Sequence, residues 1–204
     1  MNRIKKLRSR ITTDGLERVP HRAFMRAMGV DDEAMARPFV GVVTTAGEMT
    51  PCNMNLGSQT EAVKKGVVGG GGTPREFSTI TVSDGISMNH QGMKFSLVSR
   101  ELIADSVELV VRGHAYDGIV GIGGCDKNLP GLMMGMVRCN VPSVFLFGGS
   151  ALPGKWRGKD ISVLDAFEGV GALMNNEISL EELNELERAC LPTTGACAGL
   201  FTAN

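Results

Sequence analysis

The sequence has no excess of charge of either sign and few aromatic residues. Its 204 residues contain 21 Lys and Arg against 22 Asp and Glu, which gives a formal net charge of −1. Aromatic residues make up only 5%, with one Trp and one Tyr. Nucleic-acid binding domains concentrate positive charge, so this balance predicts no nucleic-acid partner.

Long apolar runs are also absent. The longest, such as residues 119–122 and 141–147, are far shorter than the roughly 20 residues of a membrane-spanning helix. The basic run at residues 3–10 lacks the apolar segment and cleavage site of a signal peptide, and we interpret it as a solvated or substrate-facing arm. We therefore expect no membrane partner.

Cysteine is scarce and glycine is abundant. The five cysteines are odd in number and scattered along a sequence without a secretory signal, which favours a reducing, cytoplasmic location and free or metal-bound thiols over disulfides. The 27 glycines and 12 methionines predict many tight turns and adaptable apolar packing. Both features suit a ligand-binding α/β fold.

Short apolar runs alternate with helical patterns. We expect buried strands at residues 39–43, 77–82, 119–122 and 144–147, and helices at residues 97–113, 130–138 and after the capping box Ser179–Glu182. This order predicts an α/β fold with a largely parallel sheet flanked by helices. No internal repeat or linker divides residues 1–204, so we expect one domain.

Cysteines and aspartates follow the expected strands in polar or glycine-rich loops. Cys52, Asp84 and the triplet Cys125-Asp126-Lys127 each lie after an apolar run, and Cys197 lies in a second glycine-rich segment. In parallel sheets the strand-end loops meet at one edge, where ligands bind. Loops of this kind can bring these distant residues together.

From the residues alone, several interpretations of these side chains stay open. The spacing of Cys52, Cys125 and Cys197 resembles neither a zinc ribbon nor a ferredoxin, and buried thiols are the ordinary interpretation, as they are for Cys139 and Cys190. Carboxylates suit Mg²⁺, but Asp84-Gly85 also fits a plain turn. Lys127 is ordinarily a surface ion-pair partner, although a desolvated lysine can take up CO₂ as a metal-binding carbamate.

Longer motifs make the pattern specific. They are Gly124-Cys125-Asp126-Lys127-Asn128-Leu129-Pro130-Gly131, Ser83-Asp84-Gly85-Ile86-Ser87-Met88, Pro51-Cys52-Asn53, and residues 7–10, 21–23, 96–106, 148–149, 153–154 and 195–204. Together they resemble the dihydroxy-acid and 6-phosphogluconate dehydratase family over nearly the whole length. Residues 158–160 and 167–172 favour the dihydroxy-acid branch.

The resemblance implies two metal centres. Cys52, Cys125 and Cys197 would bind an iron–sulfur cluster, for which the family favours 2Fe–2S over 4Fe–4S, with one iron left free to act as a Lewis acid. Asp84, Asp126 and Lys127 as its carbamate would bind Mg²⁺. The implied reaction converts 2,3-dihydroxy acids to 2-oxo acids in valine and isoleucine biosynthesis, in a homodimer of the full-length protein.

The resemblance also implies that residues 1–204 are an amino-terminal cluster-binding domain, truncated near its end and lacking the family's carboxy-terminal β-rich domain. The serine base lies beyond residue 204 in the family, so we expect this chain alone to be inactive, and its catalytic base is unknown. A sugar-acid or 6-phosphogluconate dehydratase is an enzymatic alternative. Two further alternatives are a metal- or phosphate-binding module that uses residues 69–72 and a functionally silent piece.

Overall fold

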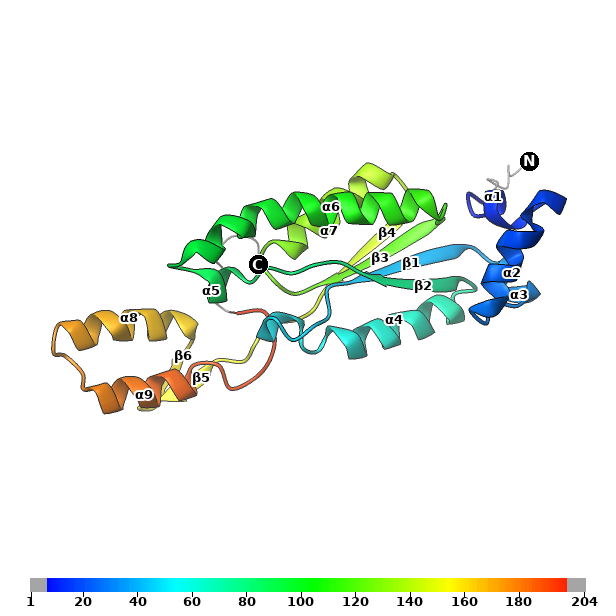
Figure 1. Cartoon of the computed structure of the whole chain (residues 1–204). Helices are drawn as coiled ribbons and strands as arrows, with labels where there is room; N and C mark the ends of the chain where they lie inside the picture. The colour runs from blue at the N-terminus through cyan, green and yellow to red at the C-terminus, as the bar shows by residue number, and fades with distance from the viewer. Residues whose placement is uncertain (1–6, 198–204) are drawn as a thin grey trace.

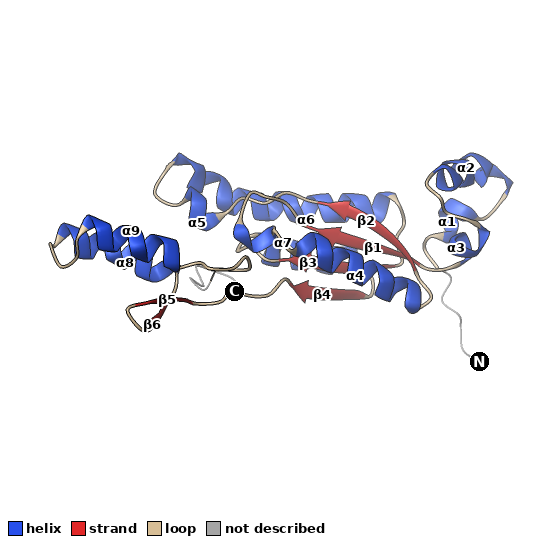
Figure 2. Cartoon of the chain, turned by 90° about the horizontal axis from the view of Figure 1, so that it is seen from below, coloured by secondary structure: helices blue, strands red, loops and turns tan. Residues whose placement is uncertain are grey.

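The computed structural model describes residues 7–197, and its centre is a parallel sheet. The strand order is β2-β1-β3-β4, with neighbouring strands parallel throughout (Figure 2). The strands are β1 (Phe39–Thr44), β2 (Thr73–Ser78), β3 (Gly118–Gly123) and β4 (Ser143–Phe147). The prediction of an α/β fold with a largely parallel sheet is therefore confirmed.

Helices cover both faces of this sheet (Figure 1). α6 (Ser96–Gly113) and α7 (Asn128–Cys139) lie on one face, where Ile103, Val107 and Leu132 form the main core. α4 (Leu56–Gly69) lies on the other face, where Leu56 packs against the sheet. α6 and α7 approach closely because α7 carries Gly135, where an added Cβ would lie 2.7 Å from the Val107 Cβ.

Short helices precede the sheet, and arginine side chains join this segment to the ends of other helices. They are α1 (Arg10–Thr13), the 3₁₀ turn η1 (Leu16–Arg18), α2 (Val19–Ala27) and α3 (Asp32–Ala36). Arg8 donates to the carbonyls of Cys139 and Asn140, and Arg10 donates to those of Met35 and Ala36. Arg8 is exposed, as expected of a solvated arm, but the guanidinium groups of Arg8 and Arg10 also bond carbonyls at helix ends.

A smaller unit with its own core extends from the carboxyl end of the sheet (Figure 1). It contains the antiparallel pair β5 (Gly154–Trp156) and β6 (Lys159–Ile161), followed by α8 (Val163–Met174) and α9 (Leu180–Ala189). Ile161, Leu186 and Cys190 form its core. The predicted capping box is confirmed, since Ser179 and Glu182 exchange side-chain-to-backbone hydrogen bonds.

Two expected strands differ from the observed ones. β2 ends at Ser78 instead of reaching residue 82, because the chain leaves the sheet after the Thr79 N–H bonds the Thr44 carbonyl. β4 is an edge strand and not a buried one: Val144 is 64% exposed, and Phe145 alone packs against the main core. The helix expected at residues 130–138 spans Asn128–Cys139. No helix within residues 7–197 has the length and apolar character needed to cross a membrane.

Candidate functional site

The site residues lie in loops at the carboxyl edge of the sheet. Cys52 follows β1 in the 3₁₀ turn η2 (Pro51–Asn53), Asp84 opens α5 (Asp84–Ser87) after β2, and Cys125, Asp126 and Lys127 lie between β3 and α7. A cavity of about 180 Å³ is lined by Cys52, Asp84, Cys125, Asp126 and Cys197. The structure thus brings together residues that are far apart in the sequence.

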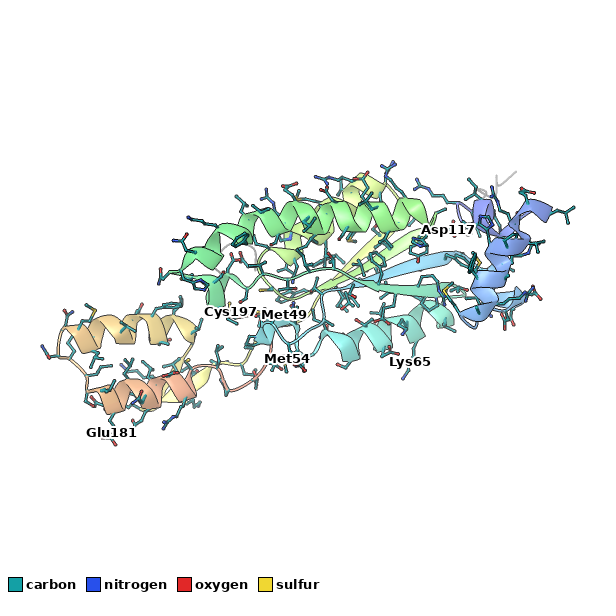
Figure 3. All side chains as sticks on the ribbon, in the orientation of Figure 1. Met49, Met54, Lys65, Asp117, Glu181 and Cys197 are labelled. Carbon is teal, nitrogen blue, oxygen red and sulfur yellow. The ribbon has the colours of Figure 1, made fainter. Side chains whose placement is uncertain are left out.

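Main-chain hydrogen bonds of the two preceding residues hold Cys197 at this cavity. Gly195 N–H donates to the Pro51 carbonyl at 3.0 Å, and Ala196 N–H donates to the Gly149 carbonyl at 2.8 Å. Gly195 has φ +144°, and a Cβ there would lie 2.5 Å from the Ala151 nitrogen. In Figure 3, Cys197 lies near one end of the sheet and Asp117 lies near the other. Residues 198–204 of the last motif lie outside the described residues.

The three thiols form a hydrogen-bonded group. Hydrogen bonds from Cys125 and then Cys197 hold the pKa of Cys52 far below its usual value. The hydrogen bond with Cys52, together with burial, raises the pKa of Cys125. The group therefore favours a thiolate at Cys52 that its neighbours stabilise, and a protonated thiol at Cys125.

Glycine at position 124 makes the contact between two of these loops possible. A Cβ on Gly124 would lie 2.2 Å from the carbonyl oxygen of Cys52, a distance that no side chain tolerates. Any substitution there must push the Cys52 loop away from the Cys125 loop. The glycine-rich character seen in the sequence thus has a defined structural role.

A buried ion pair lies beside the thiols. Lys127 Nζ is 2.5 Å from Asp84 Oδ2 and 2.5 Å from Asp126 Oδ2, and the three side chains are 10%, 1% and 5% exposed. Ser96 Oγ donates to the other oxygen of Asp84 at 2.5 Å. The interpretations of Lys127 as a surface ion-pair partner and of Asp84 as part of a plain turn are therefore wrong.

The charge state of Lys127 follows from these contacts. Burial by itself lowers the pKa of Lys127, but hydrogen bonds from Lys127 to Asp126 and Asp84, and the charges of both carboxylates, raise it overall. The ammonium group is thus the counter-charge for two buried carboxylates. Among residues 7–197, no three side chains of His, Cys, Asp and Glu form a group that could hold a single metal ion. A cation bound by Asp84 and Asp126 would need further ligands, and Lys127 and Ser96 are the side chains that contact these carboxylates.

The other sequence-predicted thiols lie elsewhere. Cys139 ends α7, and burial raises its pKa. Cys190 is the C-cap residue that follows α9, and burial raises its pKa as well. Sequence reasoning missed three polar residues that join the loops, namely Asn53, Thr81 and Asn128. The asparagines stand in the quoted motifs, but their shared partner Thr81 is visible only in the structure.

The buried ion pair predicts the effect of removing its cation. Lys127→Met leaves two buried carboxylates facing one another, and we expect it to lower the free energy of unfolding by about 3 kcal/mol in metal-free buffer. Because the pKa of Lys127 is raised in the folded state, the stability that its ammonium contributes is present at neutral pH and is lost only in strongly alkaline buffer, where the difference between variant and wild type narrows. Urea unfolding at two pH values measures both effects.

Lys64→Met is the matched control, because Lys64 also contacts two carboxylates, those of Glu61 and Glu76, but on the surface. We expect it to change stability by less than about 1 kcal/mol. Equal losses in the two variants would contradict the assignment of Lys127 as a buried counter-charge.

Comparisons with known proteins agree on one family. Residues 37–204 match the family model described as dihydroxy-acid/6-phosphogluconate dehydratase N-terminal. Dihydroxy-acid dehydratase 3 of Bradyrhizobium diazoefficiens is 67% identical over 98% of this chain and 34% of its own length. The dihydroxy-acid dehydratases of Pelagibacter ubique and Natronomonas pharaonis are 60% and 53% identical, again over 98% of this chain and 35% and 34% of their own lengths.

This chain therefore spans about a third of the length of the curated relatives that it matches. The match covers the motifs that surround Cys52, Asp84 and Cys125. By this agreement in sequence, the chain belongs to the dihydroxy-acid/6-phosphogluconate dehydratase family.

Proposed function

We propose that this chain provides the cluster-binding and cation-binding part of a dihydroxy-acid dehydratase. The observation that carries the proposal is the meeting of Cys52, Cys125 and Cys197 at one cavity, beside the buried carboxylates of Asp84 and Asp126. The proposed reaction removes water from a 2,3-dihydroxy acid and yields a 2-oxo acid. Loss of water involves no net oxidation or reduction of the substrate, so no redox partner is required.

The proposed cluster ligands are Cys52, Cys125 and Cys197. Thiolates are the usual ligands of iron–sulfur clusters, and the hydrogen-bonded thiol group already favours a thiolate. When bound, the cluster, which we propose to be 2Fe–2S, supplies a Lewis-acidic iron for the hydroxyl that leaves. Gly124 and Gly195 let the loops that carry the thiols approach closely, because a Cβ at either position would meet backbone atoms of a neighbouring segment. The sulfur atoms line a cavity of about 180 Å³, which is larger than a single ion needs.

The proposed Mg²⁺ ligands are Asp84, Asp126 and Lys127 as its carbamate. Carboxylate oxygens suit Mg²⁺, and the Lys127 ammonium now supplies the positive charge between them. A divalent cation would take over that role and remove the attraction that keeps Lys127 protonated. Burial then favours the neutral amine, which can react with CO₂ to give a carbamate and one proton.

Because cation binding comes before carbamylation in this proposal, we predict that carbamylation of Lys127 requires the cation. With ¹³C-labelled bicarbonate, we expect a carbamate signal by ¹³C NMR when Mg²⁺ is present and a much weaker signal without it. Lys127→Arg should lose the signal, whereas Lys64→Arg should keep it. A signal of equal strength with and without Mg²⁺ would show that the ammonium is not held by the carboxylates as we describe.

The names of the relatives support the dihydroxy-acid branch, and we propose valine and isoleucine biosynthesis in the cytoplasm as the setting, with a homodimer as the full-length form. A sugar-acid or 6-phosphogluconate dehydratase is the second candidate, because the matching family model covers both branches. The phosphate-module alternative finds less support. Gly69 ends α4, and Gly70 to Gly72 connect it to the amino end of β2, at the edge of the sheet away from the thiols.

Reconstitution of the cluster tests the proposal directly. After anaerobic addition of iron and sulfide to residues 1–204, we expect visible absorption and, after reduction, an EPR signal from the cluster. Cys125→Ser should lose most of both. Cys139→Ser is the matched control, since Cys139 is equally buried but lies at the far end of α7, and it should behave as the wild type. Identical spectra from wild type and Cys125→Ser would overturn the cluster assignment.

We also predict that residues 1–204 alone do not turn over 2,3-dihydroxy-3-methylbutanoate. The family resemblance implies a serine base outside this chain, so no 2-oxo acid should form even with the cluster and Mg²⁺ in place. Adding the remaining two thirds of the Bradyrhizobium relative as a separate chain should restore activity. Turnover by residues 1–204 without that chain, measured by 2-oxo acid release, would refute the prediction.

A further inference from the structure

A single hydroxyl group joins the loops that carry the proposed ligands. Thr81 lies between β2 and α5, and its Oγ1 accepts hydrogen bonds from Asn53 Nδ2 at 2.6 Å and from Asn128 Nδ2 at 3.1 Å. The three residues come from the segments that follow three different strands, with Asn53 after β1, Thr81 after β2 and Asn128 at the start of α7 after β3. We call this set the Thr81 clamp.

Each member of the Thr81 clamp is adjacent to a proposed ligand. Asn53 directly follows Cys52, and Asn128 Oδ1 accepts a hydrogen bond from the backbone N–H of Cys125 at 2.9 Å. Thr81 itself lies three residues before Asp84. The clamp therefore joins the chain segments that carry Cys52, Cys125 and Asp84.

Burial gives these hydrogen bonds their strength. Asn53 and Asn128 are 0% and 1% exposed, so water has little access to their amide groups. If the Thr81 hydroxyl were absent, both Nδ2 groups would lose their acceptor inside the protein. An unsatisfied buried donor is costly, and the loops would move apart to let water in.

We propose that Thr81 is a positioning residue that holds Cys52, Cys125 and Asp84 in one arrangement before any cofactor binds. The inference rests on the proposed ligand set, because positioning matters only where these residues act together. A merely structural role for Thr81 would stabilise the whole domain without a particular effect on the site. The two roles differ in which thiols they protect.

Thiol alkylation in the metal-free chain separates the two roles. Thr81→Val keeps the shape of the side chain and removes the hydroxyl, whereas Thr81→Ser keeps the hydroxyl. With iodoacetamide, and with each cysteine followed by mass spectrometry, we expect Thr81→Val to react about tenfold faster at Cys52 and Cys125. Cys139, buried at the far end of α7, should react at the wild-type rate. Thr81→Ser should resemble the wild type throughout.

Three results would overturn the inference: no change at Cys52 and Cys125, an equal rise at Cys139, or a Thr81→Ser variant as reactive as Thr81→Val. An equal rise at Cys139 would indicate general loosening of the domain instead of release of the site loops. Thermal unfolding of both variants accompanies the assay and identifies any variant that fails to fold.

A second measurement uses the reconstituted cluster as the probe. We expect Thr81→Val to lose the cluster to an iron chelator about tenfold faster than wild type and to show an altered EPR signal, with Thr81→Ser unchanged. Unchanged loss rate and signal in Thr81→Val would also overturn the inference. A wild-type chain that binds no cluster would instead refute the proposed function, and the alkylation assay would still decide the role of Thr81.

Discussion

The site depends on a sheet whose parallel strands end at nearly the same level. Thr44 at the end of β1 pairs with Ser78 of β2 and with Ile122 of β3, and Gly123 pairs with Phe147 of β4. Each loop therefore leaves the sheet from the same edge, whatever the distance in sequence between the strands. A strand that ran the other way would place its loop at the opposite edge, beside Asp117, where Figure 3 shows the other end of the sheet.

Two groups of acidic or ionisable side chains share this edge, and each is stabilised differently. The carboxylates of Asp84 and Asp126 are neutralised by an internal cation, the Lys127 ammonium. The thiolate favoured at Cys52 is stabilised by hydrogen bonds from Cys125, Cys197 and Thr50. The carboxylate pair is thus balanced by a full charge of the protein itself, whereas the thiolate is stabilised by hydrogen-bond donors alone among the contacts of Cys52 given above.

The sequence allowed the parallel α/β fold, the central strands and α6 to be predicted, because apolar periodicity reports burial directly. It could not predict that β4 is an exposed edge, since Val144 and Phe147 are apolar whether or not a neighbour covers them. For the site, strand-end position indicated Cys52, Asp84 and Cys125, but residue type alone left ordinary thiols and turns open. Family motifs narrowed that choice, yet the ion pair of Lys127 and the Thr81 clamp depend on contacts between loops that no local pattern contains.

The position of Cys197 depends on the smaller unit, because the whole of that unit lies between β4 and Cys197 in the sequence. The chain leaves β4, forms β5, β6, α8 and α9, and returns so that Ala196 pairs with Ser150. The return is tight, since a Cβ on Gly154 would lie 1.7 Å from the Ala189 carbonyl oxygen. Val163 and Leu191 of this unit also line the cavity. The core of Ile161, Leu186 and Cys190 closes a long loop, and without that closure the chain entropy would oppose bringing Cys197 to the two sulfur atoms held by the sheet.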